Sequence, residues 1–96
     1  MKTIWKFPLK ITDRQPILLP SQHTFLSIAD QGGQLCLWVE VETTKEIVER
    51  TIWIVGTGNP IPRAAAAFIG TVLMRPGVWH VYEGYQYPGS LEGTNG

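Results

Sequence analysis

Hydrophobic and polar residues alternate along most of the chain with a period of two, which is typical of β-strands rather than helices. In residues 5–11, WKFPLKI, one face is apolar and the other carries lysines and a proline. The apolar positions are Trp5, Phe7, Leu9 and Ile11. Pro8 has no N–H to donate to a neighbouring strand, so this strand is predicted to lie at a sheet edge or to carry a bulge. A turn at 12–14 and a short second strand at 15–19 follow.

The clearest unit is a β-hairpin. Two alternating runs, residues 24–29 and 34–42, flank the sequence DQGG at 30–33, whose glycines supply the positive φ that a tight turn requires. The predicted core face of the second run consists of Leu35, Leu37, Val39 and Val41. Trp38 lies on the opposite face among acidic residues, and we expect it to be partly exposed or covered by a partner.

Three further apolar runs complete the strand pattern. They predict strands at 47–55, 68–74 and 78–83, and the last two flank Arg-Pro-Gly at 75–77, a strong turn signal. About seven short strands separated by turns predict an all-β fold, namely a small antiparallel β-sandwich or barrel.

The chain length and the extent of the alternating strand pattern indicate how many domains the chain forms and where the domain ends. Ninety-six residues suffice for one domain, which buries roughly 60–65% of its unfolded surface, and we place it at residues 1–84. Residues 85–96 lack periodicity and are rich in Gly and Pro, so they are predicted to form a flexible tail. The segment 63–67, Arg followed by four alanines, favours a helix but is too short for an independent one, so we expect at most one helical turn.

Charge is sparse and balanced, with eight Lys and Arg against eight Asp and Glu. Non-specific binding to nucleic acid or to an anionic membrane needs a summed positive field, so a net charge of zero argues against both. The same neutrality weakens colloidal repulsion, and the chain has four tryptophans. These features favour self-association into a homo-oligomer.

The single cysteine and the hydropathy of the chain indicate the cellular compartment of the protein. Cys36 is the single cysteine and lies in an apolar strand pattern, which favours a buried thiol and a reducing, cytosolic environment. Lys6, Pro8 and Lys10 interrupt any apolar signal core near the N-terminus. No stretch approaches the ~20 apolar residues that span a bilayer. We therefore expect a soluble intracellular protein.

The segment IVGTGNPIPRAAAAFIG, residues 54–70, raises the question of a phosphate-binding loop. A dinucleotide fingerprint requires a long helix directly after its glycines, and Pro60 and Pro62 occupy the positions where that helix would begin. A P-loop requires Gly-Lys followed by Ser or Thr, which this segment lacks. The spacing excludes both motifs.

The sequence is still compatible with an anion-binding loop that follows neither motif. The backbone N–H groups of 56–58 can converge on an anion, and Arg63 can grip a phosphate, with Arg14 as a second cation. Asn59 would supply polar selection, and Pro60 restricts it to an extended conformation, so little ordering entropy remains to be lost on binding. In the alternative interpretation, the glycines shape a sheet exit and the prolines stiffen a crossover between strands.

The tryptophans offer a second candidate surface. Trp5 continues an apolar face and is predicted to be core, whereas Trp38, Trp53 and Trp79 each lie opposite the more aliphatic face of their strand. If those three faces belong to one sheet, the indoles would line a common surface for stacking on a base or docking a second subunit. In the alternative, both sheet faces are buried within the monomer. The predicted ligand-binding residues are Gly56, Thr57, Gly58, Asn59, Arg63, Trp53 and Trp79.

Catalytic groups are few. His80, His23 and Cys36 have no ligand-like spacing, so no metal site is expected. Ser21, His23 and Asp30 are near in sequence, but the chain has no nucleophile elbow. We therefore predict a protein that is not an enzyme and carries no cofactor.

Four ordered segments carry a family resemblance: WKFPLKITDRQ at 5–15, IVGTGNPIP at 54–62, FIGTV at 68–72 and VWHVYE at 78–83. Together they resemble a family of small, uncharacterised proteins from tailed bacteriophages and related prophages, over about residues 3–83. The resemblance implies a phage origin and action in the cytoplasm of a bacterial host. It brings no established active site, so no catalytic residue is transferred.

A phage origin favours two functions. Small non-enzymatic phage proteins often oppose host defence, either by sequestering a nucleotide immune signal or by coating a host protein. We predict the first, with a cyclic oligonucleotide or ADP-ribose derivative held in a rigid pocket assembled at an oligomer interface. The alternative is a protein–protein interaction module that blocks a host defence protein or serves as a minor structural or accessory phage protein.

Overall fold

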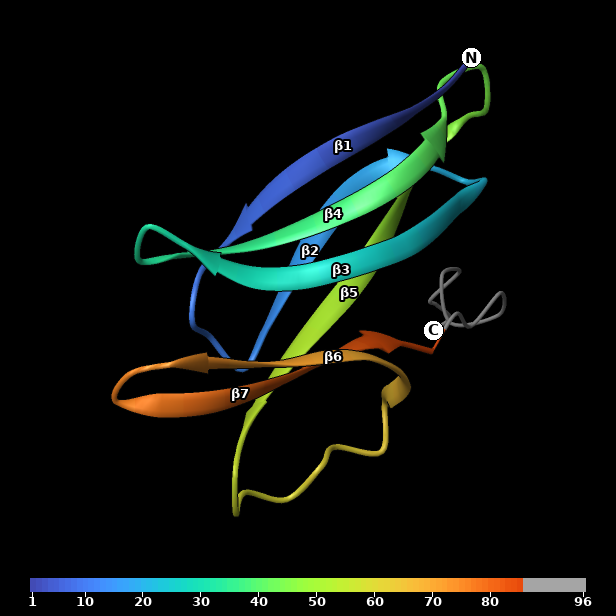
Figure 1. The fold of residues 1–96 in the computed structure, drawn as a ribbon. Coiled ribbons are helices and arrows are strands. Elements are labelled where there is room, and N and C mark those ends of the chain that lie inside the picture. The colour runs from blue at the N-terminus through green and yellow to red at the C-terminus, as the bar shows by residue number, and fades with distance from the viewer. Residues whose placement is uncertain (86–96) are drawn as a thin grey trace.

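A computed structural model describes residues 1–85 and contains seven antiparallel strands in two sheets, with no helix in this part of the chain (Figure 1). The strands are β1 (Lys2–Leu9), β2 (Arg14–Pro20), β3 (His23–Gln31), β4 (Gln34–Glu42), β5 (Ile47–Gly56), β6 (Ala65–Met74) and β7 (Gly77–Gly84). One sheet has the order β1-β4-β3 and the other the order β2-β5-β7-β6. The predicted small all-β antiparallel fold is confirmed.

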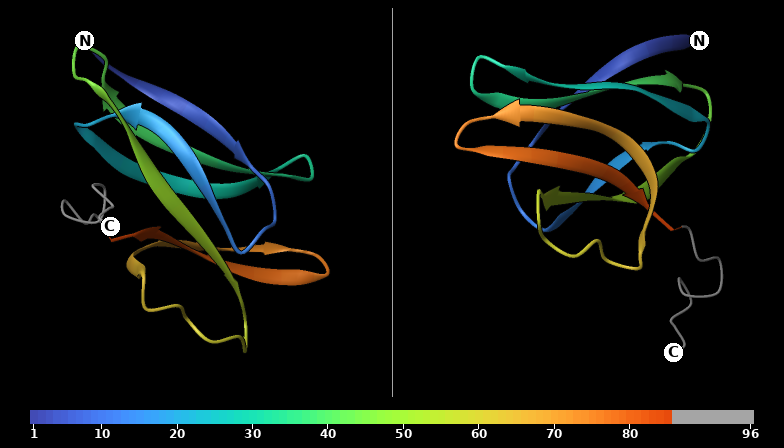
Figure 2. Two further views of the ribbon diagram at one scale, coloured as in Figure 1. Left: turned by 180° about the vertical axis from the view of Figure 1, so that it is seen from behind. Right: turned by 60° about the horizontal axis from the view of Figure 1, so that its bottom comes forward.

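The two sheets stack as layers of a sandwich and share one apolar core (Figure 2). The buried side chains are Leu9, Leu35, Leu37, Val39 and Val41 from the first sheet and Ile17, Leu19, Ile52, Ile54, Val72 and Val81 from the second. The predicted core face of β4 is therefore confirmed. Ile11 was wrongly placed on the core face of the first strand, because β1 ends at Leu9 and Ile11 is 43% exposed in the following turn.

The hairpin between β3 and β4 has the turn chemistry that its glycines predict. Gly32 and Gly33 adopt φ values of 60° and 87°, and the Gly33 N–H donates to Asp30 Oδ1 at 2.8 Å. Positive φ at both central turn residues matches the right-handed twist of the flanking strands. On its other side β4 pairs with β1, which is an edge strand, as Pro8 requires.

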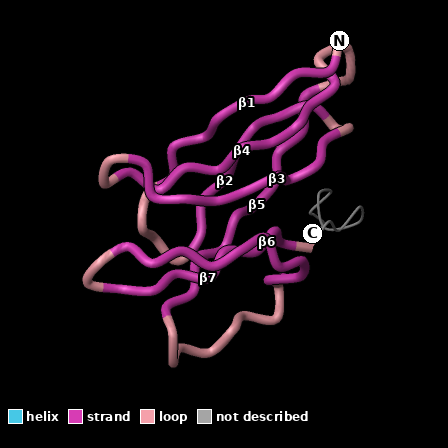
Figure 3. Tube along the Cα trace, in the orientation of Figure 1, coloured by secondary structure: helices cyan, strands magenta, loops and turns pink. Residues whose placement is uncertain are grey.

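The strand order of the second sheet determines the course of the long loop, residues 57–64. β7 lies between β5 and β6 and is antiparallel to both, so β5 and β6 are parallel. Gly56 pairs with Trp79 near one end of β7, and Ala65 pairs with Gly84 at the other. The loop must therefore travel along the sheet, about 17 Å at 3.3–3.4 Å per residue of β7. Figure 3 shows it as the extended loop between β5 and β6.

We expected at most one helical turn at 63–67, and this segment forms none. The Ala65 N–H donates to the Pro62 carbonyl at 3.0 Å in a turn, and Ala65–Met74 is a strand. Pairing with β7 supplies a ladder for this segment, and the Tyr85 N–H donates to the Ala64 carbonyl at 2.9 Å. Tertiary pairing thus overrides the helix propensity of the alanines.

Two further predictions concern the chain ends and the membrane. The predicted flexible tail at 85–96 lies, apart from Tyr85, outside the described residues. Across residues 1–85 there is no helix of a length and apolarity that could cross a bilayer.

Candidate functional site

The candidate site lies on the outer face of the four-stranded sheet, beneath loop 57–64. Because strand side chains alternate, Ile54 and Val81 face the core, whereas Val55, His80 and Tyr82 face outward beneath the loop. A cavity of about 300 Å³ separates the loop from this surface. Its lining residues are Val55, Gly56, Thr57, Gly58, Asn59, Ile61, His80 and Tyr82. None of them carries a formal charge when His80 is neutral.

Two further cavities adjoin the first. One of about 290 Å³ is lined by Asp13, Trp53, Ile54, Val55, Asn59, Pro60 and Pro62. The other, about 410 Å³, is lined by Gly56, Thr57, Asn59, Pro76, Gly77, Val78 and Trp79. Asn59 borders all three cavities and is the central polar residue of the site.

Local turn geometry holds Asn59 in this position. Gly58 adopts φ 92°, and the Asn59 N–H donates to the Gly56 carbonyl at 3.0 Å. The side-chain carboxamide has no hydrogen-bond partner among residues 1–85. A carboxamide offers both donors and an acceptor, so Asn59 can bind a ligand edge that presents either.

His80 is held between two threonine hydroxyls. Thr57 Oγ1 lies 2.8 Å from His80 Nε2, and Thr71 Oγ1 lies 2.8 Å from His80 Nδ1. The three residues come from the loop, β7 and β6. Of them, Thr57 and His80 line the first cavity. The imidazole is thereby fixed in orientation at the cavity wall.

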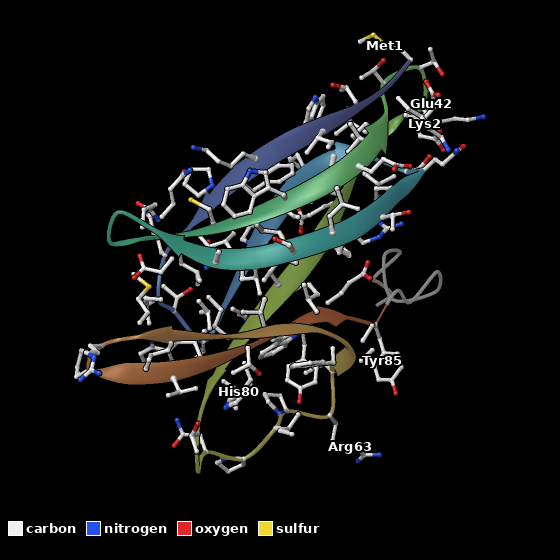
Figure 4. All side chains as sticks on the ribbon, viewed as in Figure 1. Met1, Lys2, Glu42, Arg63, His80 and Tyr85 are labelled. Carbon is white, nitrogen blue, oxygen red and sulfur yellow. The ribbon has the colours of Figure 1, made fainter. Side chains whose placement is uncertain are left out.

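The predicted phosphate grip is not assembled. Among the predicted backbone amides of 56–58, the Thr57 N–H already donates to the Val78 carbonyl at 3.3 Å, and the N–H of the neighbouring Asn59 is used within the turn. Arg63 is exposed, borders none of the three cavities and points away from the sheet (Figure 4). It follows Pro62, where the chain turns into β6. Asp13, an acid, is the charged residue that lines these cavities in the described part of the chain.

A protein-family model described as Domain of unknown function (DUF7352) matches residues 1–90. The chain belongs to the DUF7352 family. No curated protein and no solved structure matches this DUF7352 chain. The family match includes all seven strands and the loop, and it extends beyond the 3–83 segment of the phage resemblance.

Trp38, Trp53 and Trp79, which would share a surface if their faces belonged to one sheet, are separated in this DUF7352 protein. Trp38 lies on the three-stranded sheet, while Trp53 and Trp79 lie on opposite faces of the other sheet. Trp53 pairs with Tyr82 and faces outward; Trp79 pairs with Gly56 and packs against the core. The condition for a common indole surface, that the three faces belong to one sheet, is not met, because Trp38 lies on the other sheet and the strand register places Trp53 and Trp79 out of phase.

Trp53 and Trp79, two of the predicted ligand-binding residues, line the second and third cavities rather than the first. Trp53 lines the second cavity, and the guanidinium of Arg14 lies 5.6 Å from its ring centroid. Arg14 is thus engaged with an aromatic face and lines neither of the first two cavities. Trp79 lines the third cavity at the end of the sheet.

The other reactive side chains of the DUF7352 chain lie apart from the site. His23 Nδ1 lies 2.6 Å from the Pro20 carbonyl, and His23 Nε2 lies 3.7 Å from Glu83 Oε2. Asp30 caps the hairpin at the opposite end of β3, and Cys36 is buried on β4. Within residues 1–85, no group of three or more His, Cys, Asp or Glu side chains is gathered as a metal site would require.

Proposed function

We propose that this protein is a non-enzymatic binding protein that holds an uncharged planar ring of a small ligand beneath loop 57–64. The observation that carries the proposal is the cavity of about 300 Å³, which is uncharged when His80 is neutral, has aromatic walls and carries at its rim the Asn59 carboxamide, unpaired among residues 1–85. Ligand sites are typically concave and mostly apolar, with a few polar groups that fix orientation.

The side chains of the cavity favour a heteroaromatic ring with an amide-like edge. Tyr82 and His80 supply aromatic surface, and Val55 and Ile61 supply apolar contacts. The carboxamide of Asn59 can pair with adjacent donor and acceptor groups, as asparagine does with the edge of adenine. A nucleobase satisfies these requirements.

On this proposal, the phosphates of the ligand stay in solvent. No cation lines the cavity within the described chain, and two backbone amides of the loop are already used. A volume of about 300 Å³ is also at the lower limit for ligand pockets. The site would therefore receive one base of a nucleotide rather than a complete cyclic oligonucleotide.

In an infected bacterial cell, which the phage resemblance implies, such a site would sequester a nucleotide immune signal. Cyclic oligonucleotides and ADP-ribose derivatives both carry a base for the cavity. Our proposal is thus an anti-defence protein of the host cytoplasm that recognises its signal through the base.

Calorimetric titration with cyclic dinucleotides, cyclic trinucleotides, ADP-ribose derivatives and the parent nucleosides tests this proposal. We expect a nucleoside to bind about as tightly as its nucleotide, because no phosphate contact contributes. Asn59→Ala should weaken binding about tenfold or more, the loss expected for about 1.4 kcal/mol of hydrogen bonding.

Arg63→Ala is the matched control on the same loop and should leave the affinity unchanged, because this side chain lies outside the cavity. Absence of heat with every nucleoside would overturn the proposal. So would an affinity that depends on Arg63 and is insensitive to Asn59.

A protein–protein interaction module is the second candidate, favoured by exposed apolar side chains. Leu18, Phe68 and Leu73 on the second sheet, and Ile61 on the loop, are 57–60% exposed. Phe68 and Leu73 lie on β6 and Leu18 lies on β2, the two edge strands of this sheet. Exposed apolar patches often mark an interaction site. A host defence protein, a phage component or a second copy of the chain could cover them.

A further inference from the structure

We infer that His80 and Thr71 are positioning residues that decide whether the Thr57 hydroxyl offers a ligand its proton or its lone pair. This inference rests on the proposed ring-binding function and adds which ring edges the cavity accepts. Thr57 borders the cavity, whereas Thr71 acts only through the imidazole.

The hydrogen-bonded chain has a fixed geometry. Thr71 and His80 face each other across the β6–β7 ladder, and their side chains meet at 2.8 Å. Thr57 directly follows β5, and its N–H donates to the Val78 carbonyl, two residues before His80 on β7. Strand pairing positions Thr71 and His80, and the backbone hydrogen bond to Val78 positions Thr57, so both hydroxyls lie within hydrogen-bond distance of the imidazole.

A neutral imidazole carries one N–H proton, so one ring nitrogen donates while the other accepts. When Nδ1–H donates to Thr71 Oγ1, Nε2 accepts the hydroxyl proton of Thr57, and lone pairs of Thr57 Oγ1 face the cavity. When Nε2–H donates to Thr57 Oγ1, the Thr71 hydroxyl donates to Nδ1. The Thr57 proton is then free to point at the ligand. The two states contain the same atoms and the same charge.

The two states suit two kinds of ring edge. Asn59 can rotate its carboxamide to present either the oxygen or the NH₂ group. With the Thr57 proton directed outward, Thr57 and Asn59 match a ring nitrogen beside an exocyclic amino group. With the Thr57 lone pair outward, they match a ring N–H beside a carbonyl. The cavity therefore accepts both amino-type and keto-type rings.

Adenosine and inosine provide a matched pair of probes, because they differ at the six-position as amino and keto forms. We expect the wild-type protein to bind them within about threefold of each other. The ¹⁵N shifts of His80 should report the Nε2–H tautomer with adenosine and the Nδ1–H tautomer with inosine. A purely structural role for the histidine predicts no such difference.

Variants of Thr71 test the positioning role. Thr71→Val replaces the hydroxyl that accepts from Nδ1–H by a methyl group, so the Nε2–H tautomer, which keeps its bond to Thr57, should be favoured over the Nδ1–H tautomer. Inosine should then bind about tenfold more weakly relative to adenosine, and Thr71→Ser should restore the wild-type ratio. Thermal unfolding of both variants verifies their folding, and the wild-type spectra test the inference without any variant.

The outcomes separate the two proposals. If neither nucleoside binds, the ring-binding function fails and this inference fails with it. If both bind and His80 keeps one tautomer in both complexes, only this inference is overturned. An unchanged adenosine-to-inosine ratio in folded Thr71→Val would also overturn it.

Discussion

At Gly77 the absence of a side chain determines how one end of the four-stranded sheet packs. The Trp79 indole lies against this residue, and a Cβ added at Gly77 would be 2.6 Å from Cζ2 and 2.9 Å from Cε2. Gly77→Ala should therefore overpack the site and lower the free energy of unfolding by about 1–3 kcal/mol. Urea denaturation measures the change.

Gly70→Ala is a matched control in the neighbouring strand. A Cβ there would meet only the Ile28 side chain within 4 Å, nearest at Cγ2 at 2.6 Å, so one methyl group has to move rather than a whole indole. We expect a smaller loss. Combining Gly77→Ala with Trp79→Leu should recover part of the cost of the alanine, and strict additivity of the two changes would contradict the packing argument.

Glu42 should contribute to stability in a defined pH range. Its pKa is lowered from 4.5 to about 2, first by the hydrogen bond from the Met1 ammonium and then by the Thr44 hydroxyl and N–H. A carboxyl whose pKa falls on folding stabilises the protein above the unfolded-state pKa and loses that effect as pH falls through the folded value. We expect the loss between about pH 4.5 and 2.

The variant Glu42→Gln tests this linkage, because it keeps the shape of the side chain and removes the titration. Its urea midpoint should depend less on pH than that of the wild type below pH 4.5. Equal pH dependence in the two proteins would show that the contact contributes nothing in solution.

Individual residues differ in how far the sequence predicts them. Alternation along β4 was sufficient to predict its buried face, because strand periodicity has one solution when one face is apolar. Arg63 and Trp79 were assigned to the site from their sequence neighbours alone. Their directions depend on the turn after Pro62 and on the register of β5 with β7, which are tertiary features.

At the scale of elements, loop 57–64 is a short crossover between parallel strands. Such connections usually take a dozen or more residues and contain a helix. Here the eight residues run along the sheet without one, as the alternative sequence interpretation of a stiffened crossover proposed. The loop is at once a crossover and the roof of a cavity.

We expect Pro60 and Pro62 to stabilise the folded loop 57–64 by lowering the conformational entropy of the unfolded chain. Proline restricts the unfolded chain, so Pro60→Ala and Pro62→Ala should each cost about 0.4–1 kcal/mol of unfolding free energy. Ligand affinity should fall as well, because more loop entropy is lost on binding. Urea denaturation and calorimetry with adenosine measure the two effects; a gain in either stability or affinity would contradict the role of the prolines.

The hairpins were predictable as elements because their turns are local. Given the turn at 75–77, counting outward along the hairpin places Thr71 opposite His80, so this contact could have been found from the sequence. The insertion of β7 between β5 and β6 could not, since the pairing of β5 with β7 joins segments separated by a long loop. For that reason Tyr82 and His80 were not recognised as the floor beneath the loop.

For the whole molecule, the exposed apolar side chains of β6 are the proposed site of association with a second copy. The chain has no net charge, and Phe68 and Leu73 are 58% and 59% exposed on β6. If a second copy covers them, light scattering should show a dimer or larger oligomer that Phe68→Lys with Leu73→Lys converts to a monomer.

Ile4→Lys supplies the control, because Ile4 is equally exposed, at 58%, on the other sheet. This variant should keep the oligomeric state of the wild type. A wild-type protein that remains monomeric at high concentration would remove a second copy from the candidates for this face and leave a different protein as its partner.

The central position of β7 also has a consequence for synthesis on the ribosome. This strand is translated after both of its neighbours, so β5 and β6 are synthesised before the strand that joins them exists. Until then, the segment carrying Asn59 spans a gap between two unjoined strands. A nascent chain that lacks its seventh strand therefore also lacks the floor of the cavity, which His80 and Tyr82 of that strand form.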